Sequence, residues 1–206
     1  MRQVFLLSPA RCDGRRAAAV LNPTAQFALA VRLRESGAPL GEVFTFLSGL
    51  YFRGKIAYSE RFARPPERAP AALIITTDRG LVRPDAVVST SDLRAFSEVD
   101  IGAGDDRFRT PLERDAGALR DSIDSDTCIV LLGSIATGKY SDVLLSIFEK
   151  RLVFPQEFVG RGDMSRGGLM LRAARDHREL EYVSVGGAIR HGKRPPKLEP
   201  MGRERA

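Results

Sequence analysis

Residues 127–148 read TCIVLLGSIATGKYSDVLLSIF, an apolar run, a glycine-rich turn and an amphipathic segment in direct succession. The run Cys128–Leu132 is apolar throughout, which predicts a strand buried on both faces. The segment 142–150 has the apolar spacing of a helix that covers such a strand. Because strand, turn and helix in this order are the building unit of parallel sheets, the stretch indicates an α/β fold.

Further strand and helix patterns on both sides of this stretch extend the same arrangement. Short apolar runs predict strands at Gln3–Leu7, 71–76 and 152–154. One helix is expected to begin at Asn22-Pro23, because asparagine can cap the first N–H groups and proline suits the first helical position. Further helices are expected at residues 41–50, 52–63, 111–120 and 166–175. We therefore predict a three-layer α/β sandwich with a mostly parallel central sheet.

The chain has 206 residues, enough for one domain with a substantial core. We predict a single α/β domain over residues 1–185 and a basic, weakly ordered tail over residues 186–206. The tail holds six Lys or Arg against two Glu, so it carries +4 of the net charge of +6. The apolar runs fall far short of the roughly 20 residues that span a membrane, and no signal-peptide pattern opens the chain. A cytoplasmic protein without a membrane partner is expected.

Neither cysteine belongs to a metal-ligand pattern. Cys12 and Cys128 lie far apart, with no C-x-x-C pair and no histidine at ligand spacing. The sequence therefore predicts reduced thiols and no metal site, and it identifies no cofactor.

Loops that follow strands are the candidate sites, because parallel sheets bind ligands at the carboxyl ends of their strands. The loop 133–140 spells G-x-x-x-x-G-K, one residue short of a P-loop, since Tyr140 stands where that motif needs Ser or Thr for Mg²⁺. Its backbone N–H groups and the following helix would attract a phosphate. The alternative is a tight turn whose glycines serve packing and whose lysine is solvated. The candidate phosphate ligands here are Gly133, Ser134, Thr137, Gly138 and Lys139.

Residues 160–168 (GRGDMSRGG) supply two arginines beside a predicted helix start. Arg161 and Arg166 offer planar guanidinium groups that match a phosphate. The glycines between and around them, Gly162 among them, give a flexible backbone rich in N–H groups. This loop could complete the rim of the same phosphate site, and a solvated surface loop is the alternative.

The loop after the first strand, SPARCDGRR (residues 8–16), holds a thiol, a carboxylate and three arginines. Asp13 is a candidate general base, and Cys12 is a candidate nucleophile whose pKa the arginines would lower. Asp78, at the end of the second strand, is the third candidate catalytic residue, and Arg11 is a candidate rim residue. The alternatives are that Asp13 pairs with an arginine or caps a helix, and that Cys12 is inert.

Three tyrosines complete the candidate site. Tyr51 and Tyr58 are seven residues apart, which places them on one face of a helix, where they could stack on a base. Packing in the core is the alternative. Tyr140 is assigned to the same rim.

The order of these motifs resembles a largely uncharacterised group of bacterial proteins, which is distantly similar to the uracil-DNA-glycosylase-like domain of archaeal tRNA-guanine-modifying enzymes such as archaeosine synthase. The residues that carry the resemblance are Cys12, Tyr51, Phe52, Tyr58, Gly80, Leu81, Pro84, Asp85, Gly133 and Tyr140. The resemblance implies a glycosylase-like α/β sandwich and a nucleobase pocket formed by the loops after the strands. It also implies a water-activating role for Asp13, and it makes Tyr140 the expected residue at its position.

Together these features predict a protein that binds a nucleotide or nucleobase, and an enzyme that acts on a nucleoside, a nucleotide or a nucleic-acid base. The loops 133–140 and 160–168 would hold its phosphate. One alternative is a non-catalytic nucleic-acid-binding module that uses the basic tail, and its affinity would fall steeply with salt. The other alternative is a P-loop-like NTPase.

Overall fold

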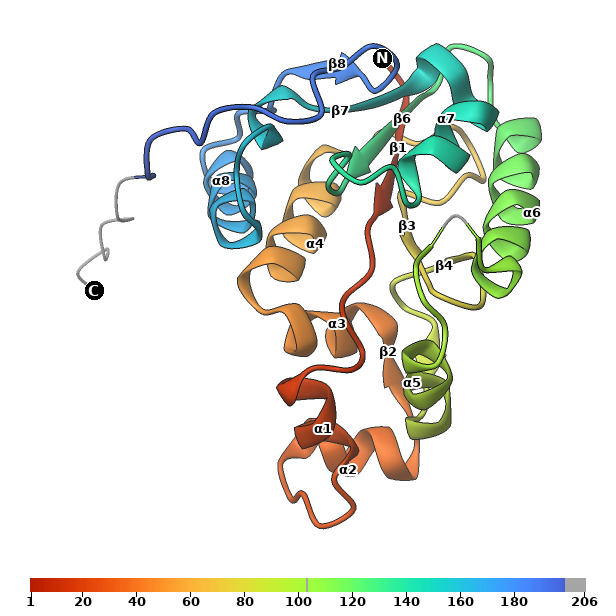
Figure 1. The fold of residues 1–206 in the computed structure, drawn as a ribbon, viewed down its shortest axis with the longest axis vertical. Helices are drawn as coiled ribbons and strands as arrows, with labels where there is room; N and C mark the ends of the chain where they lie inside the picture. Colours follow the sequence, from red (N-terminus) through yellow and green to blue (C-terminus); the bar gives the residue numbers. More distant parts are fainter. Residues whose placement is uncertain (103, 199–206) are drawn as a thin grey trace.

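The computed structural model describes residues 1–102 and 104–198 (Figure 1). Within these residues, each helix is too short or too polar to cross a lipid bilayer. In chain order the elements are β1 (Gln3–Leu7), α1 (Arg15–Leu21), α2 (Ala28–Glu35), β2 (Ala38–Pro39), α3 (Leu40–Ser48), α4 (Leu50–Phe62), β3 (Ala72–Ile75), β4 (Leu81–Val82), β5 (Val87–Val88), α5 (Thr90–Ser97), α6 (Asp106–Ser122), β6 (Cys128–Leu132), α7 (Ser141–Phe148), η1 (Glu149–Arg151), β7 (Leu152–Pro155), η2 (Gln156–Phe158), α8 (Asp163–Arg175) and β8 (Tyr182–Ser184).

Six strands form one sheet in the order β4-β3-β1-β6-β7-β8. The four inner strands are parallel, and the edge strands β4 and β8 run antiparallel to their neighbours. Strand β1 lies at the centre, with Phe5 opposite Ala72 on one side and Val130 on the other. All five residues of β1 are buried, as expected for a strand covered on both faces. The prediction of an α/β fold with a mostly parallel sheet is confirmed.

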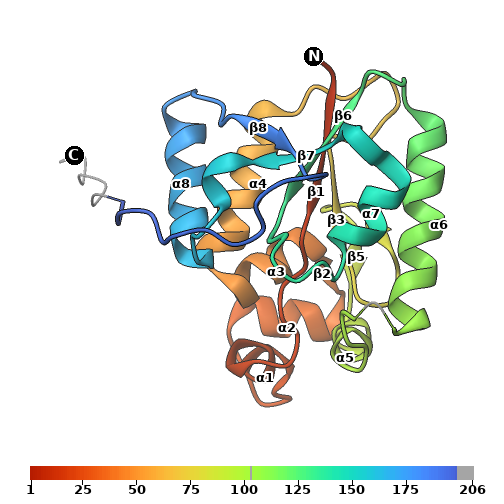
Figure 2. The same cartoon turned by 45° about the horizontal axis from the view of Figure 1, so that its top comes forward.

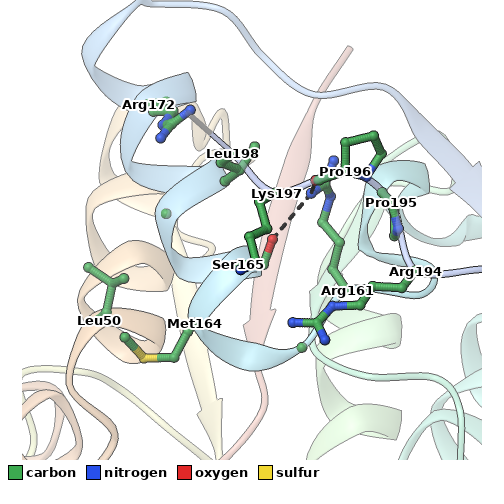
Figure 3. A pocket seen from close by; sticks show the side chains of 12 residues that line it. Leu50, Arg161, Met164, Ser165, Arg172, Arg194, Pro195, Pro196, Lys197 and Leu198 are labelled. Carbon is green, nitrogen blue, oxygen red and sulfur yellow. Dashed lines mark hydrogen bonds between the residues drawn. The ribbon is translucent and has the colours of Figure 1, made fainter. Parts of the chain in front are cut away.

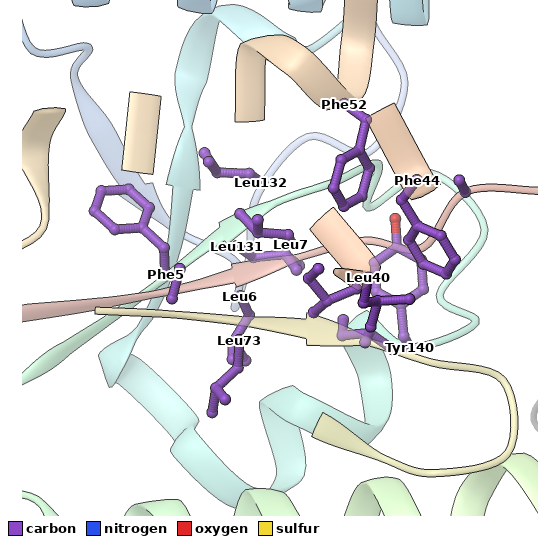
Figure 4. Packing of buried hydrophobic residues seen from close by; sticks show 14 of the residues in the cluster. Phe5, Leu6, Leu7, Leu40, Phe44, Phe52, Leu73, Leu131, Leu132 and Tyr140 are labelled. Carbon is purple, nitrogen blue, oxygen red and sulfur yellow. The ribbon is translucent and has the colours of Figure 1, made fainter. Parts of the chain in front are cut away.

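Helices cover both faces of this sheet (Figures 1 and 2). Helices α4 and α8 lie on one face, and α6 and α7 lie on the other. Helices α1, α2, α3 and α5 gather beyond the carboxyl end of β1, together with the small sheet of β2 and β5. Figure 4 shows the core, where Phe44 and Phe52 from α3 and α4 meet the leucines of the central strands. The rings of Phe44 and Phe52 pack edge to face, with 5.3 Å between their centroids.

Two glycines let helices α4 and α8 pack closely against each other. A Cβ on Gly54 would lie 2.7 Å from the carbonyl oxygen of Gly167, and a Cβ on Gly167 would lie 2.6 Å from that of Leu50. Neither contact is possible without a backbone shift. The two glycines therefore bring the N-terminal halves of α4 and α8 side by side.

The predicted strands agree with β1, β3, β6 and β7 to within one residue at each end. The prediction that a helix begins at Asn22-Pro23 is wrong. Asn22 instead follows the last residue of α1, and its Oδ1 accepts a hydrogen bond from the Thr24 amide at 2.9 Å. The asparagine thus stabilises a turn, and α2 begins only at Ala28.

The described part of the tail, residues 186–198, has no helix or strand but lies against the body. Arg190 pairs with Asp142, and the Pro196 carbonyl oxygen accepts a hydrogen bond from Arg161 Nη1 at 3.4 Å. These contacts place parts of the predicted tail against the body of the protein. Residues 199–206 of the predicted tail lie outside the described residues.

Candidate functional site

The strand order reverses between β1 and β6. From β1 the chain passes to β3 on one side, and from β6 it passes to β7 on the other. The loops that follow these two strands therefore diverge and leave a crevice at their carboxyl ends. Open parallel sheets bind their ligands at such points, so this crevice is the candidate site.

A cleft of about 300 Å³ lies at this edge of the sheet. The loop after β1 lines it with Arg11, Cys12 and Asp13, and the loop after β6 adds Lys139. Thr77 after β3 and the region that follows α5 complete the wall. The structure thus brings together four residues that the sequence analysis singled out in two separate loops.

Arg11 and Asp13 form an exposed ion pair on the rim of the cleft. The guanidinium donates from Nε and Nη2 to the two carboxylate oxygens, at 3.0 and 2.9 Å. This hydrogen bonding holds the pKa of Asp13 below its usual value. Asp13 therefore stays ionised, but its lowered pKa makes it a weak proton acceptor.

Cys12 does not have the properties of a nucleophile. Its side chain is buried, and its thiol lies 3.6 Å from the Ala10 carbonyl oxygen. The pKa of Cys12 is raised to about 12, mainly by burial and also by the negative charges of Asp13 and Asp78. The arginines of the loop were expected to lower this pKa, and the opposite is found because the thiol faces the interior and two carboxylates.

Among the candidate catalytic residues, Asp78 has the environment best suited to a proton acceptor. Its Oδ1 is buried without a hydrogen-bond partner among the described residues, and Arg79 Nε lies 3.7 Å away. Burial raises the pKa of Asp78, and the charge of Arg79 counteracts that rise. Asp78 directly follows Thr77, which lines the cleft, but Asp78 is not itself one of the lining residues. A raised pKa and an unused oxygen suit proton transfer better than the paired Asp13 does.

Lys139 faces the cleft, but the rest of its loop is not an open phosphate cradle. Thr137 is exposed, whereas Gly138 is buried and has a φ of +69°, which favours glycine. The carboxylate of Asp142, in the first turn of α7, packs against Gly138. A carboxylate at a helix N-terminus interacts favourably with the positive end of that helix, so Asp142, itself paired with Arg190, takes the position that an external anion would need.

Tyr140 is an interior residue. Its side chain is 8% exposed, and its hydroxyl interacts with Ser8. Burial raises the pKa of Tyr140, and the interaction with Ser8 partly offsets this effect. A Cβ on Gly133 would lie 2.7 Å from the Tyr140 hydroxyl oxygen and 2.8 Å from Ser8 Cβ. The first glycine of the P-loop-like spacing therefore makes room for Tyr140.

A buried network that the sequence analysis did not predict centres on Lys55 of α4. Lys55 has no exposed surface, and its Nζ donates to the carbonyl oxygen of Ser8 at 2.8 Å and to its Oγ at 2.7 Å. The same Nζ lies 4.0 Å from the centre of the Tyr51 ring. Burial lowers the pKa of Lys55 to about 7, with Asp163 raising it and Arg166 lowering it. Near neutral pH the amine is therefore divided between its charged and neutral forms.

The burial of Lys55 is hard to predict from sequence, because a lysine in an amphipathic helix is normally solvated. A signal was nonetheless present in the sequence. Tyr51, Lys55, Tyr58 and Phe62 are spaced by four, three and four residues, which puts the lysine in the middle of an apolar helix face. A lysine there has to be buried with hydrogen-bond partners, and Ser8 follows the buried strand β1 directly.

Tyr51 and Tyr58 pack in the core and do not reach the rim. Tyr51 is 5% exposed, and Tyr58 has no exposed surface. The Tyr58 hydroxyl lies 2.7 Å from that of Tyr182 and accepts a hydrogen bond from the Leu180 amide at 2.9 Å. Burial raises the pKa of Tyr58 to about 12. The alternative of core packing therefore describes both rings, and neither presents a face for a base.

The second predicted phosphate loop, residues 160–168, does not reach the cleft. Arg166 is buried, and its Nε donates to the Phe158 carbonyl oxygen at 3.2 Å. Where Arg166 approaches Gly133 and Ser134, the enclosed space is only about 10 Å³, too little for a phosphate.

Arg161 and Gly162 line a separate groove beside α8. The predicted phosphate ligands are therefore divided between the cleft, this groove and the small space beside Arg166, and Lys139 is the member of the set that lines the cleft.

Among residues 1–102 and 104–198, no three His, Cys, Asp or Glu side chains are grouped closely enough to hold a metal ion. Comparison of the chain with protein-family models, with curated proteins and with solved structures found no match. The residues of the cleft and their place at the edge of the sheet are therefore the features that point to a function.

Proposed function

We propose that the cleft binds a nucleotide or another nucleobase-containing ligand, and that the protein acts on this ligand as an enzyme. One observation carries the proposal: Arg11 and Asp13 meet Lys139 in one cleft, at the point where the strand order reverses. Open parallel sheets bind nucleotides at such points. The volume of about 300 Å³ is at the lower end of the range for small-molecule sites, which suits a ligand of this size.

The lining of the cleft holds residues that suit both parts of a nucleotide. Lys139 and Arg11 supply positive charge for a phosphate. Val99 and Ile101 contribute apolar surface, which favours contact with a flat base. The ionised Asp13 can accept a hydrogen bond from a base or a ribose hydroxyl, and Asp78 is the candidate proton acceptor.

A P-loop-like NTPase has less support. Such an enzyme needs a magnesium-binding hydroxyl directly after the lysine, whereas Tyr140 is directed into the interior beside Ser8. The Asp142 carboxylate also lies where the phosphates of a P-loop ligand would approach the helix. The proposal therefore takes Lys139 as one cation on the rim of the cleft.

Replacing Lys139 with alanine tests the phosphate position. Calorimetric titration with a nucleoside monophosphate should show binding weaker than in the wild type by at least about tenfold, because a hydrogen bond to a charged group contributes about 1.5–3 kcal/mol. Binding of the matching nucleoside should change little. The control is Lys150→Ala, which removes an exposed lysine after α7 and should leave both affinities unchanged.

Unchanged affinity for the monophosphate in Lys139→Ala, or no binding of any nucleobase ligand to the wild type, would refute the site. Enzymatic action is tested on the same ligands by mass spectrometry. Binding without any conversion of the ligand would refute the enzymatic part of the proposal and leave the binding part standing.

A further inference from the structure

A second cavity, of about 420 Å³, opens between the start of α8 and an extended segment of the tail, residues 194–198 (Figure 3). We call it the tail groove. Leu50, at the start of α4, lines it as well. Within the described chain it shares no lining residue with the cleft. The tail groove is therefore a separate feature that exists because the tail lies along the body.

Cations line the tail groove, and no acidic side chain in the described part of the chain does so. The cations are Arg161, Arg172, Arg194 and Lys197. Arg161 donates from Nη1 to Ser165 Oγ at 3.2 Å and to the Pro196 carbonyl oxygen, which holds its guanidinium at the wall. Arg172 already interacts within the protein, so the field that attracts anions comes mainly from Arg161, Arg194 and Lys197.

These cations do not converge on a single point. Figure 3 places Arg172 at one end of the tail groove, and Arg161 and Arg194 at the other. Apolar surface lies to one side of these cations, from Leu50 and from Met164, which is 66% exposed. One phosphate could contact one end only, whereas a chain of phosphates separated by sugars and bases would contact both ends and the apolar surface beside them.

We propose that the tail groove binds the phosphate backbone of a single-stranded nucleic acid. Its cations contact successive phosphates, and its apolar surface contacts the sugars or bases between them. Arg194 and Lys197 are exposed and lie three residues apart on an extended segment, so they can reach neighbouring phosphates. The proposal does not depend on the ligand of the cleft, because the two sites have no residue in common.

The test is fluorescence anisotropy with a labelled oligothymidylate of twelve nucleotides, over a series of salt concentrations from about 50 to 200 mM. The double variant Arg194→Ala/Lys197→Ala should bind the strand about tenfold more weakly at the lowest salt concentration. The slope of log affinity against log salt should become shallower by about 1.4, since each lost phosphate contact contributes about 0.7 for a single strand. Both residues are exposed, so the fold should be retained, and circular dichroism would verify this.

The matched control is Arg120→Ala/Lys150→Ala. It removes the same charge from α6 and from the segment after α7, and α6 lies on the opposite face of the sheet from α8 (Figure 2). Retained affinity in the control supports a specific groove. An equal loss in both double variants, or no change in slope for the groove variant, would overturn the proposal and leave only a general effect of net charge.

A competition experiment distinguishes a strand from an isolated phosphate. Adenosine monophosphate and inorganic phosphate should displace the labelled strand only at concentrations far above that of unlabelled oligothymidylate. Equal competition by the monophosphate would show that the groove holds one phosphate, and it would overturn the assignment to a strand.

Discussion

Two regions at the carboxyl edge of the same sheet have opposite effects on the charged form of their side chains. At the cleft, Arg11 and Asp13 are exposed and paired, and the pKa of Asp13 is lowered by that pairing. A few residues earlier in the chain, Ser8 contacts Lys55, which is fully enclosed and whose pKa falls to about 7. Water and a paired cation support the charge in the first region, and burial opposes it in the second.

The difference shows which region is free to change and which is constrained. An exposed ion pair contributes little to stability, so each of its two residues can leave its partner and bind a ligand instead. A buried lysine has few ways to satisfy its amine, so its contacts with Ser8 fix the start of the loop that carries Arg11 and Asp13. The buried region therefore holds the loop, and the exposed region is where a ligand can bind.

The largest effect is expected from adding one methyl group to the buried region. Gly133→Ala should destabilise the protein by roughly 3 kcal/mol, because its Cβ would meet the Tyr140 hydroxyl and Ser8 Cβ at 2.7 and 2.8 Å. Urea unfolding monitored by circular dichroism measures the change.

The matched control lies in the exposed region. Gly14 follows Asp13, has open space around its Cβ position and has a φ of −89°, which alanine can adopt. Gly14→Ala should change the free energy of unfolding by less than about 1 kcal/mol. Similar effects of the two substitutions would contradict the distinction between the regions.

The next effect concerns the pH dependence of stability. The pKa of Lys55 is about 7 in the folded protein and 10.5 for an ordinary lysine, so between these values the unfolded chain binds a proton that the folded protein does not. The destabilisation from charging the buried amine is fully present below pH 7 and disappears as the pH rises. The free energy of unfolding should therefore rise between pH 7 and pH 9, by up to about 2.7 kcal/mol at about 1.4 kcal/mol per unit.

In Lys55→Met this contribution should vanish, so its stability should rise less over the same pH range than that of the wild type. Urea unfolding at pH 7, 8 and 9 provides the comparison. Lys150→Met, which replaces an exposed lysine, should keep the wild-type pH dependence. Equal pH dependence in the wild type and in Lys55→Met would mean that Lys55 is not the titrating group.

The sequence predicted the inner strands well because their signal is local. A run such as Cys128–Leu132 is apolar at every position, and few structures other than a buried strand accept such a run. The helix start at Asn22 failed because asparagine stabilises turns as readily as helix N-termini, and tertiary packing decides between them. The short strands β2 and β5 each have two residues, too few to give a pattern.

The candidate site was predictable only in part, because proximity in sequence does not give the direction of a side chain. Lys139 and Asp13 follow inner strands, and the rule for parallel sheets brings them to one edge. Arg166 carries the same charge as Lys139, yet it points inward to the Phe158 carbonyl oxygen. Lys55 is joined to Ser8 across 47 positions of sequence, a contact that only the packing of α4 against the sheet creates.

The smallest effect concerns the ion pair itself and separates charge from stability. Arg11→Gln should raise the pKa of Asp13 towards its ordinary value, because hydrogen bonding from Arg11 is the main cause that lowers it, and carboxyl titration by NMR would measure this. The melting temperature should not change measurably, since both side chains are exposed.

Arg83→Gln is the control, because Arg83 lowers the pKa of Asp85, two positions later in the sequence, in the same way and outside the cleft. It should raise the pKa of Asp85 and leave that of Asp13 unchanged. If Arg11→Gln left the Asp13 pKa low, another cation would have to hold this carboxylate, and Arg11 would not be the group that a ligand phosphate draws away from it.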